Sequence, residues 1–128
     1  MKKRAIYVAG AYSSGTTMGT LLNIRRAIQW GNEIMKAGHA PLVPHLDFQM
    51  IINLQGRYIP EVKDLQEIAM AWLEKADAVF VVPDSEDSTG TQKEILRAME
   101  LNIPVHNKLE ALLTEMTIME LKDQPKAA

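Results

Sequence analysis

The 128-residue sequence contains no cysteine, only 5% aromatic residues and no long hydrophobic run. The absence of cysteine excludes disulfides and thiolate metal sites, and it is compatible with a cytoplasmic protein. No apolar run approaches the roughly 20 residues of a membrane-spanning helix, so we expect no membrane partner. The three histidines lack the spacing of metal ligands, and the sequence indicates neither a metal nor a cofactor.

Neither sign of charge predominates, because the formal net charge is only −2 and basic and acidic residues are interspersed. We therefore expect no nucleic-acid partner. Hydrophobic residues make up 47% of the chain, which excludes disorder and is enough for one real core. The basic start is followed by an apolar run that a strand explains better than a signal peptide. We expect a single domain over residues 1–122 and a frayed tail over 123–128.

Short apolar runs alternate with segments whose apolar residues recur at helical spacing. The runs predict strands at 5–9, 40–43, 79–82 and 103–106, and the periodic segments predict helices at 21–37, 60–76, 90–101 and 109–119. This alternation predicts an α/β fold, a three-layer sandwich with a four- to five-stranded parallel sheet in flavodoxin-like or Rossmann-like order. Residues 46–59 show no clear period, and a lid, a subunit contact, a plain loop and a short helix all stay open.

Polar segments follow three of the predicted strands, and the carboxyl edge of an open parallel sheet is its usual ligand site. The loop from Gly10 to Thr17 is rich in glycine and hydroxyls and could present N–H groups to a phosphate, although it could also be a flexible connection. It is neither a P-loop nor a GxGxxG fingerprint. His45 follows the second strand, where a structural role is the alternative to a ligand contact.

Glu94 lies one turn into the helix that follows the polar segment 83–90. Gly90 and Ala98, four residues before and after it, share its helix face and leave room beside the carboxylate. An acidic residue in a first turn also suits the helix dipole and can complete a capping box. The convergence with the Gly10 loop and His45 favours a functional role for Glu94.

Several stretches together resemble the nucleoside 2-deoxyribosyltransferase superfamily over about residues 5–106. They are Ile6-Tyr7-Val8-Ala9-Gly10 with Tyr12-Ser13; Asn23-Ile24 with Ala27; Gly38-His39-Ala40-Pro41 with Pro44-His45; Trp72-Leu73 with Ala76-Asp77-Ala78; and Ser88-Thr89-Gly90 with Glu94 and Ala98. The chain is most similar to small phage and bacterial members of uncharacterised function and to the 2'-deoxynucleoside 5'-monophosphate N-hydrolases.

The resemblance implies that Glu94 attacks C1' of a sugar, displaces the base and forms a glycosyl-enzyme ester, which water or a second base resolves. The helix N-terminus should favour the ionised form that this nucleophile needs. A small-molecule nucleotide substrate and a homodimer or higher homo-oligomer are also implied. The predicted substrate contacts are Gly10, Ala11, Tyr12, Ser13, Ser14, His45, Ser88, Gly90 and Thr91.

Two positions bear on the substrate and on turnover. Six residues before the nucleophile, the nucleoside transferases have an Asp that meets a sugar hydroxyl, whereas the monophosphate hydrolases have a Ser that meets phosphate; here it is Ser88, although Asp87 lies beside it. The resemblance therefore favours a nucleoside 5'-monophosphate. The family often has an Asp three residues before Trp72, but here the residue is Ala69.

Other functions stay open. Gly90-Thr91-Gln92-Lys93-Glu94 is similar to the GGxGTxxE signature of cytokinin-activating phosphoribohydrolases, without the first glycine of the pair. The absence of an Asp at Ala69 favours a nucleotide-binding or sensing domain without turnover. The few aromatic residues argue against a flavin-binding, flavodoxin-like function.

Overall fold

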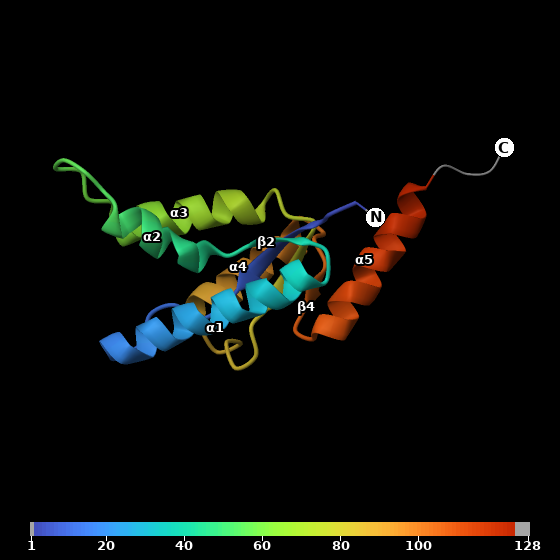
Figure 1. The fold of residues 1–128 in the computed structure, drawn as a ribbon, viewed down its shortest axis with the longest axis horizontal. Helices are drawn as coiled ribbons and strands as arrows, with labels where there is room; N and C mark the ends of the chain where they lie inside the picture. The colour runs from blue at the N-terminus through green and yellow to red at the C-terminus, as the bar shows by residue number, and fades with distance from the viewer. Residues whose placement is uncertain (1, 125–128) are drawn as a thin grey trace.

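The computed structural model describes residues 2–124, which form a four-stranded parallel sheet between two layers of helices (Figure 1). The strand order is β2-β1-β3-β4, so β1 has β2 on one side and β3 on the other. The strands are β1 (Ala5–Ala9), β2 (Ala40–Leu42), β3 (Ala78–Val81) and β4 (Val105–His106). The predicted three-layer α/β fold is confirmed, with the first four strands of the flavodoxin-like order.

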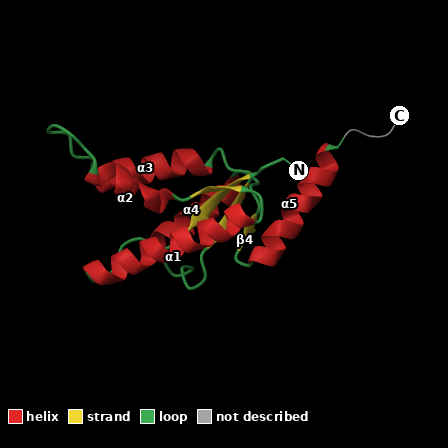
Figure 2. Cartoon of the chain, in the orientation of Figure 1, coloured by secondary structure: helices red, strands yellow, loops and turns green. Residues whose placement is uncertain are grey.

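Helices lie on both faces of the sheet (Figure 2), and three of them begin at a capping side chain. Thr16 caps the first helix by accepting a hydrogen bond from the Gly19 N–H at 3.0 Å. Glu61 and Asp64 form a reciprocal capping box, so the helix expected from residue 60 begins at Val62. The helices are α1 (Thr17–Lys36), α2 (Asp47–Ile52), α3 (Val62–Leu73), α4 (Thr89–Glu100) and α5 (Leu109–Asp123), with a 3₁₀ turn, η1 (Pro44–Leu46).

The alternation of side chains along the strands divides the core into two halves. Ile6 and Val8 of β1 pack with Phe80 against α1 and α5. Tyr7 and Ala9 point to the other face, which α3 and α4 cover. Tyr7 therefore places its hydroxyl group in the layer that also contains the first turns of α4.

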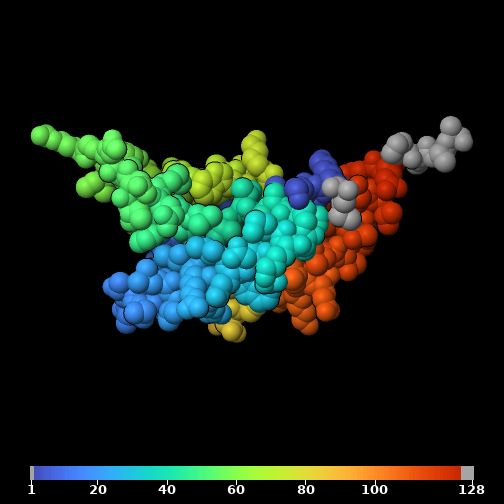
Figure 3. All heavy atoms as spheres, in the orientation of Figure 1, coloured from blue at the N-terminus to red at the C-terminus, as the bar shows by residue number. Residues whose placement is uncertain are grey.

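Several predicted boundaries were wrong by a few residues. The second strand ends at Leu42 rather than residue 43, and the fourth begins at Val105 rather than residue 103. Pro104 has no N–H to give to the sheet, although its carbonyl accepts a hydrogen bond from Val79 N at 2.9 Å. Residues 46–59 contain the short helix α2 and a loop that projects from the body of the molecule (Figure 3).

The end of the chain contacts the start of β1. Arg4 is buried, and its guanidinium donates hydrogen bonds to Asp123 at 2.6 Å and to Glu120 at 3.3 Å. Asp123, the first residue of the predicted frayed tail, is thus the last residue of α5; residues 125–128 of that tail lie outside the described residues. Within residues 2–124, no helix is both long and apolar enough to cross a bilayer.

Candidate active site

A cavity of about 930 Å³ opens at the carboxyl ends of β1, β2 and β3. Its lining comes from the loop after β1, from η1 and α2 after β2, from α3, and from the loop and first turns of α4 after β3. This is the crevice where the strand order reverses around β1, the usual ligand site of an open parallel sheet. It contains eight of the ten predicted site residues: Gly10, Ala11, Tyr12, Ser13, His45, Ser88, Gly90 and Glu94.

Glu94 and Tyr7 both line the cavity and contact each other. The Tyr7 hydroxyl donates a hydrogen bond to Glu94 Oε2, joining the middle of β1 to the second turn of α4. Burial raises the pKa of Glu94 to about 7, although the hydrogen bond from Tyr7 acts to lower it. Burial and the nearby Glu94 charge raise the pKa of Tyr7, so Tyr7 stays protonated and remains the donor. The helix N-terminus was expected to keep Glu94 ionised, but burial outweighs it.

The loop after β1 passes very close to the end of β3. A Cβ at Gly10 would lie 2.9 Å from Val82 Cγ2, so a larger residue would push the loop outward. The Ala11 N–H donates to Ser85 Oγ at 3.0 Å, and the Ala11 carbonyl lies 3.1 Å from His45 Nε2. Both backbone groups of Ala11 are therefore used inside the protein, and its contribution to a ligand site is to shape the wall.

His45, Tyr12 and Asp47 form a linked cluster on the β2 side of the cavity. The Tyr12 and His45 rings stack with their centroids 5.3 Å apart and their planes inclined by 19°. The Tyr12 hydroxyl donates to Asp47 Oδ1 at 3.1 Å. Asp47 is only 8% exposed, and burial raises its pKa. Burial lowers the pKa of His45, which favours the neutral imidazole at pH 7.

The N-terminus of α4 forms the facing wall on the β3 side. Ser88 is the N-cap, and its Oγ accepts a hydrogen bond from the Thr91 N–H at 3.4 Å. Lys93 brings an ammonium group to this wall, and Asp87 brings a carboxylate. The carboxylate of Asp84 lies 3.6 Å from the Arg26 guanidinium, which partly balances its charge. Hydroxyl, N–H and ammonium groups suit an anionic ligand group.

Two predicted contact residues do not line the cavity. The Ser14 hydroxyl turns back into its own loop and donates to the Thr16 carbonyl at 2.8 Å. Thr91, in the first turn of α4, is fully buried, and its Oγ1 lacks a hydrogen-bond partner among residues 2–124. Their hydroxyls suggested ligand contacts in the sequence, but each side chain points away from the cavity.

Sequence reasoning missed Tyr7, Asp47 and most of the α3 wall. Tyr7 lies within the apolar run of residues 5–9, which does not mark it as a site residue. Because side chains alternate along a strand, Tyr7 lies on the sheet face that α4 covers. Asp47 falls in the segment that showed no period. Ala69 does line the cavity, so the position where the resemblance places an Asp is inside the site and carries a methyl group.

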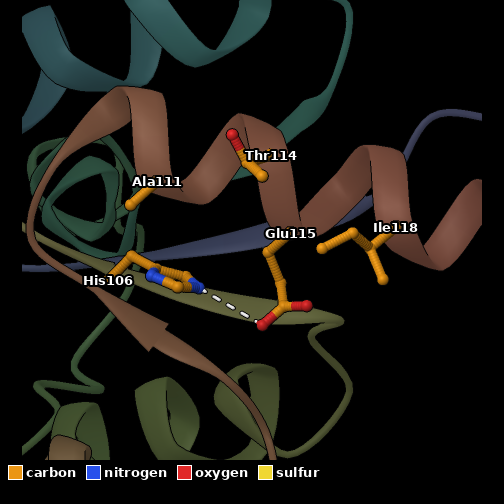
Figure 4. Close-up of a pocket in the computed structure, with 5 residues that line it drawn as sticks. All are labelled: His106, Ala111, Thr114, Glu115 and Ile118. Atoms are coloured by element: carbon orange, nitrogen blue, oxygen red, sulfur yellow. Dashed lines mark hydrogen bonds and ion pairs between the residues drawn. The ribbon is translucent and has the colours of Figure 1, made fainter.

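A second, smaller cavity of about 240 Å³ lies between β4 and α5 (Figure 4). His106 Nε2 and Glu115 Oε1 are 3.4 Å apart across its floor, and Ala111 and Ile118 add apolar walls. Glu94 does not line it. In the part of the chain that the structure describes, no cluster of three or more histidine or acidic side chains is arranged to hold a metal ion.

The fold and this cavity define a parallel α/β protein with a half-buried carboxyl group at the carboxyl edge of its sheet. The chain belongs to the family described as a domain of unknown function, DUF7768, whose model matches residues 4–108. A solved 2-deoxyribosyltransferase from the psychrotolerant bacterium Bacillus psychrosaccharolyticus is similar at a TM-score of 0.54 and 21% identity, over 79% of this chain and 69% of that chain. That likeness shows a shared fold. No curated protein matches the chain.

Proposed function

We propose that the protein breaks the N-glycosidic bond of a nucleoside 5'-monophosphate through a covalent glycosyl-Glu94 intermediate. The observation that carries this proposal is the position of Glu94, half-buried in the cavity and hydrogen-bonded by Tyr7. A carboxylate held by one donor and otherwise facing an open cavity is suited to attack an anomeric carbon. The shared fold with a 2-deoxyribosyltransferase supports the same class of bond as the target.

The reaction would begin with the sugar beside Glu94 and its phosphate at the start of α4. One Glu94 carboxylate oxygen bonds to C1' as the bond to the base breaks, and the electron pair of that bond leaves with the base. Water, or a second base in a transferase, then attacks C1' and releases the carboxylate. Tyr7 holds Glu94 in position during both steps, and His45 and Tyr12 form an aromatic surface for the base.

Incubation with a panel of ribo- and deoxyribonucleoside 5'-monophosphates, followed by detection of free base, tests the proposal. Release of free base supports it. Tight binding without release would instead favour a nucleotide-binding or sensing domain, the second candidate, which is favoured by the methyl group of Ala69 in the cavity wall. The panel also separates ribose from deoxyribose substrates, which distinguishes the phosphoribohydrolase alternative.

Ser88 is proposed to meet the 5'-phosphate, so Ser88→Asp should discriminate between substrates. Aspartate is also a good N-cap, so α4 should persist, but its charge opposes a phosphate. We expect kcat/KM for monophosphates to fall about ten- to a hundredfold, while that for the matching nucleosides is kept or rises. Ser88→Ala, which removes the hydroxyl without adding charge, should give a smaller loss. Equal losses for both substrates with Ser88→Asp would refute the phosphate contact.

We also propose that the chain forms a homodimer through the apolar surface of residues 46–62. Several large apolar side chains there are exposed: Leu46, Met50, Ile52, Leu54, Tyr58, Ile59 and Val62. Val62 also lines the cavity, so a partner covering this surface would reach the mouth of the site.

Light scattering should give twice the 14.3 kDa mass of one chain. Ile59→Lys, at a residue that is 82% exposed, should raise the dimer dissociation constant about tenfold or more. Leu121→Lys, a similar change on α5, is the matched control and should leave it unchanged. A wild-type protein that stays monomeric at high concentration would contradict the dimer.

A further inference from the structure

Besides the half-buried Glu94, the cavity contains a buried carboxyl group, Asp47, that has no role in the nucleophilic attack. Asp47 is 8% exposed and lines the cavity at the start of α2. A buried carboxyl group is costly unless it is paired or protonated, and its hydroxyl partner is the neutral phenol of Tyr12. The buried position of Asp47 therefore indicates a chemical role in the cavity.

The strand order places the two carboxyl groups on different sides of the cavity. Asp47 follows β2, Glu94 follows β3, and β1 with Tyr7 runs between these strands. In a displacement at C1', the nucleophile and the departing base lie on opposite faces of the sugar carbon. A sugar seated against Glu94 would therefore direct its base toward the side that holds Asp47, His45 and Tyr12.

The other groups on that side are poor proton donors toward a base. Nε2 of His45 lies 3.1 Å from the Ala11 carbonyl, so it carries the proton of the neutral ring. Nδ1 of His45, buried and without a hydrogen-bond partner among the described residues, is then an acceptor. Burial raises the pKa of Tyr12 to about 12, and the hydroxyl of Tyr7 is engaged with Glu94. Burial raises the pKa of Asp47, so its proton is retained at higher pH than in water.

We propose that Asp47 is the catalytic acid that protonates the departing base. In the first step, the C1'–N bond breaks with its electron pair moving to the base, the Asp47 proton goes to a ring nitrogen or carbonyl oxygen of that base, and Glu94 bonds to C1'. In the second step, water bonds to C1', its proton returns to Asp47, and the ester bond to Glu94 breaks. Both carboxyl groups are restored. This inference rests on the proposed glycosidic cleavage and deepens it.

The test compares two leaving groups on the same 5'-phosphorylated sugar, a natural base and 4-nitrophenol, which leaves without a proton. Asp47→Asn should lower kcat for the nucleotide about a hundredfold or more, and for the nitrophenyl substrate less than about tenfold. Asp87→Asn, the same change at an exposed carboxylate on the facing wall, should affect both substrates alike. Asp47→Ser is the second variant if Asp47→Asn does not fold.

The outcomes separate this proposal from the function on which it rests. If the wild type releases neither leaving group, the glycosidic function itself fails. If the wild type releases both and Asp47→Asn slows both equally, or neither, the function stands and the role of Asp47 is overturned. A second test uses only the wild type and measures kcat for sugar phosphates that carry nitrophenols of different acidity. An acid catalyst makes this rate depend weakly on the pKa of the leaving group. A steep dependence would overturn the proposal.

Discussion

Glu94→Gln is expected to lower the rate of base release from a nucleoside 5'-monophosphate by about a thousandfold or more. The amide has nearly the shape of the carboxylate and can still accept the hydrogen bond from Tyr7, so the fold and the cavity should persist. It cannot form the ester at C1', however, so cleavage through the covalent intermediate is blocked. Free base measured under single-turnover conditions gives the rate without interference from slow product release.

A matched control is available in the same cavity. Glu67 of α3 also lines it, but its carboxylate is solvent-exposed and lies 3.8 Å from the Lys63 ammonium. Glu67→Gln should change the rate by less than about fivefold, because an exposed ion pair of this kind contributes little. Intact-mass measurement after acid quenching should show a sugar phosphate on the wild type and none on Glu94→Gln. Equal activity of Glu94→Gln and wild type would eliminate the covalent mechanism.

The layers of the fold could be predicted because burial on two faces leaves a plain pattern in the sequence. The run at residues 5–9 is apolar without alternation, as expected for a strand covered by helices on both sides. Gly38, with φ of 97°, and Asn102, with φ of 58°, follow the ends of α1 and α4 and directly follow the ranges 21–37 and 90–101 predicted for these helices. Few other residues accept that backbone region. These signals are local and do not require knowledge of which strands pair.

The cavity could be predicted only in part, because it depends on which side chains share a face. Strand-end loops must meet at one edge, and this geometric rule brought Gly10, His45 and Glu94 together. The rule does not predict Tyr7, whose side chain reaches the cavity from the middle of β1. It also says nothing of Asp47, whose short helix has too few turns to show a period.

The charge state of Glu94 cannot be predicted from its position along α4 alone. The sequence places Glu94 near the N-terminus of α4, where the dipole favours a carboxylate. In the structure the same group lies in the cavity against Tyr7 of β1, and burial raises its pKa to about 7. The balance between dipole and burial depends on depth in the fold, which the position along α4 does not determine.

Tyr7→Phe is expected to shift the pH dependence of base release to higher pH. The nucleophile must be ionised, so the rising limb of the wild-type profile should follow the pKa of Glu94, about 7, whereas loss of the Asp47 proton should set the falling limb. The Tyr7 hydrogen bond stabilises the ionised form; without it, burial acts unopposed and the pKa of Glu94 rises. A hydrogen bond to a charged group is worth about 1.5–3 kcal/mol, so the rising limb should move by about one to two pH units.

At pH 7 the same substitution should lower the rate about five- to fiftyfold, and with the 4-nitrophenyl substrate, which needs no proton from Asp47, most of the loss should be recovered at alkaline pH. The other ionisable groups that line the cavity remain in place: Tyr12, His45, Asp47, Lys63, Glu67, Asp84, Asp87 and Lys93. Tyr58→Phe, which removes the hydroxyl of a surface tyrosine that is 63% exposed, is the matched control and should leave the profile unchanged. A Tyr7→Phe profile that coincides with that of the wild type would show that the phenol does not set the charge of Glu94, and a uniform loss at every pH would assign Tyr7 to positioning alone.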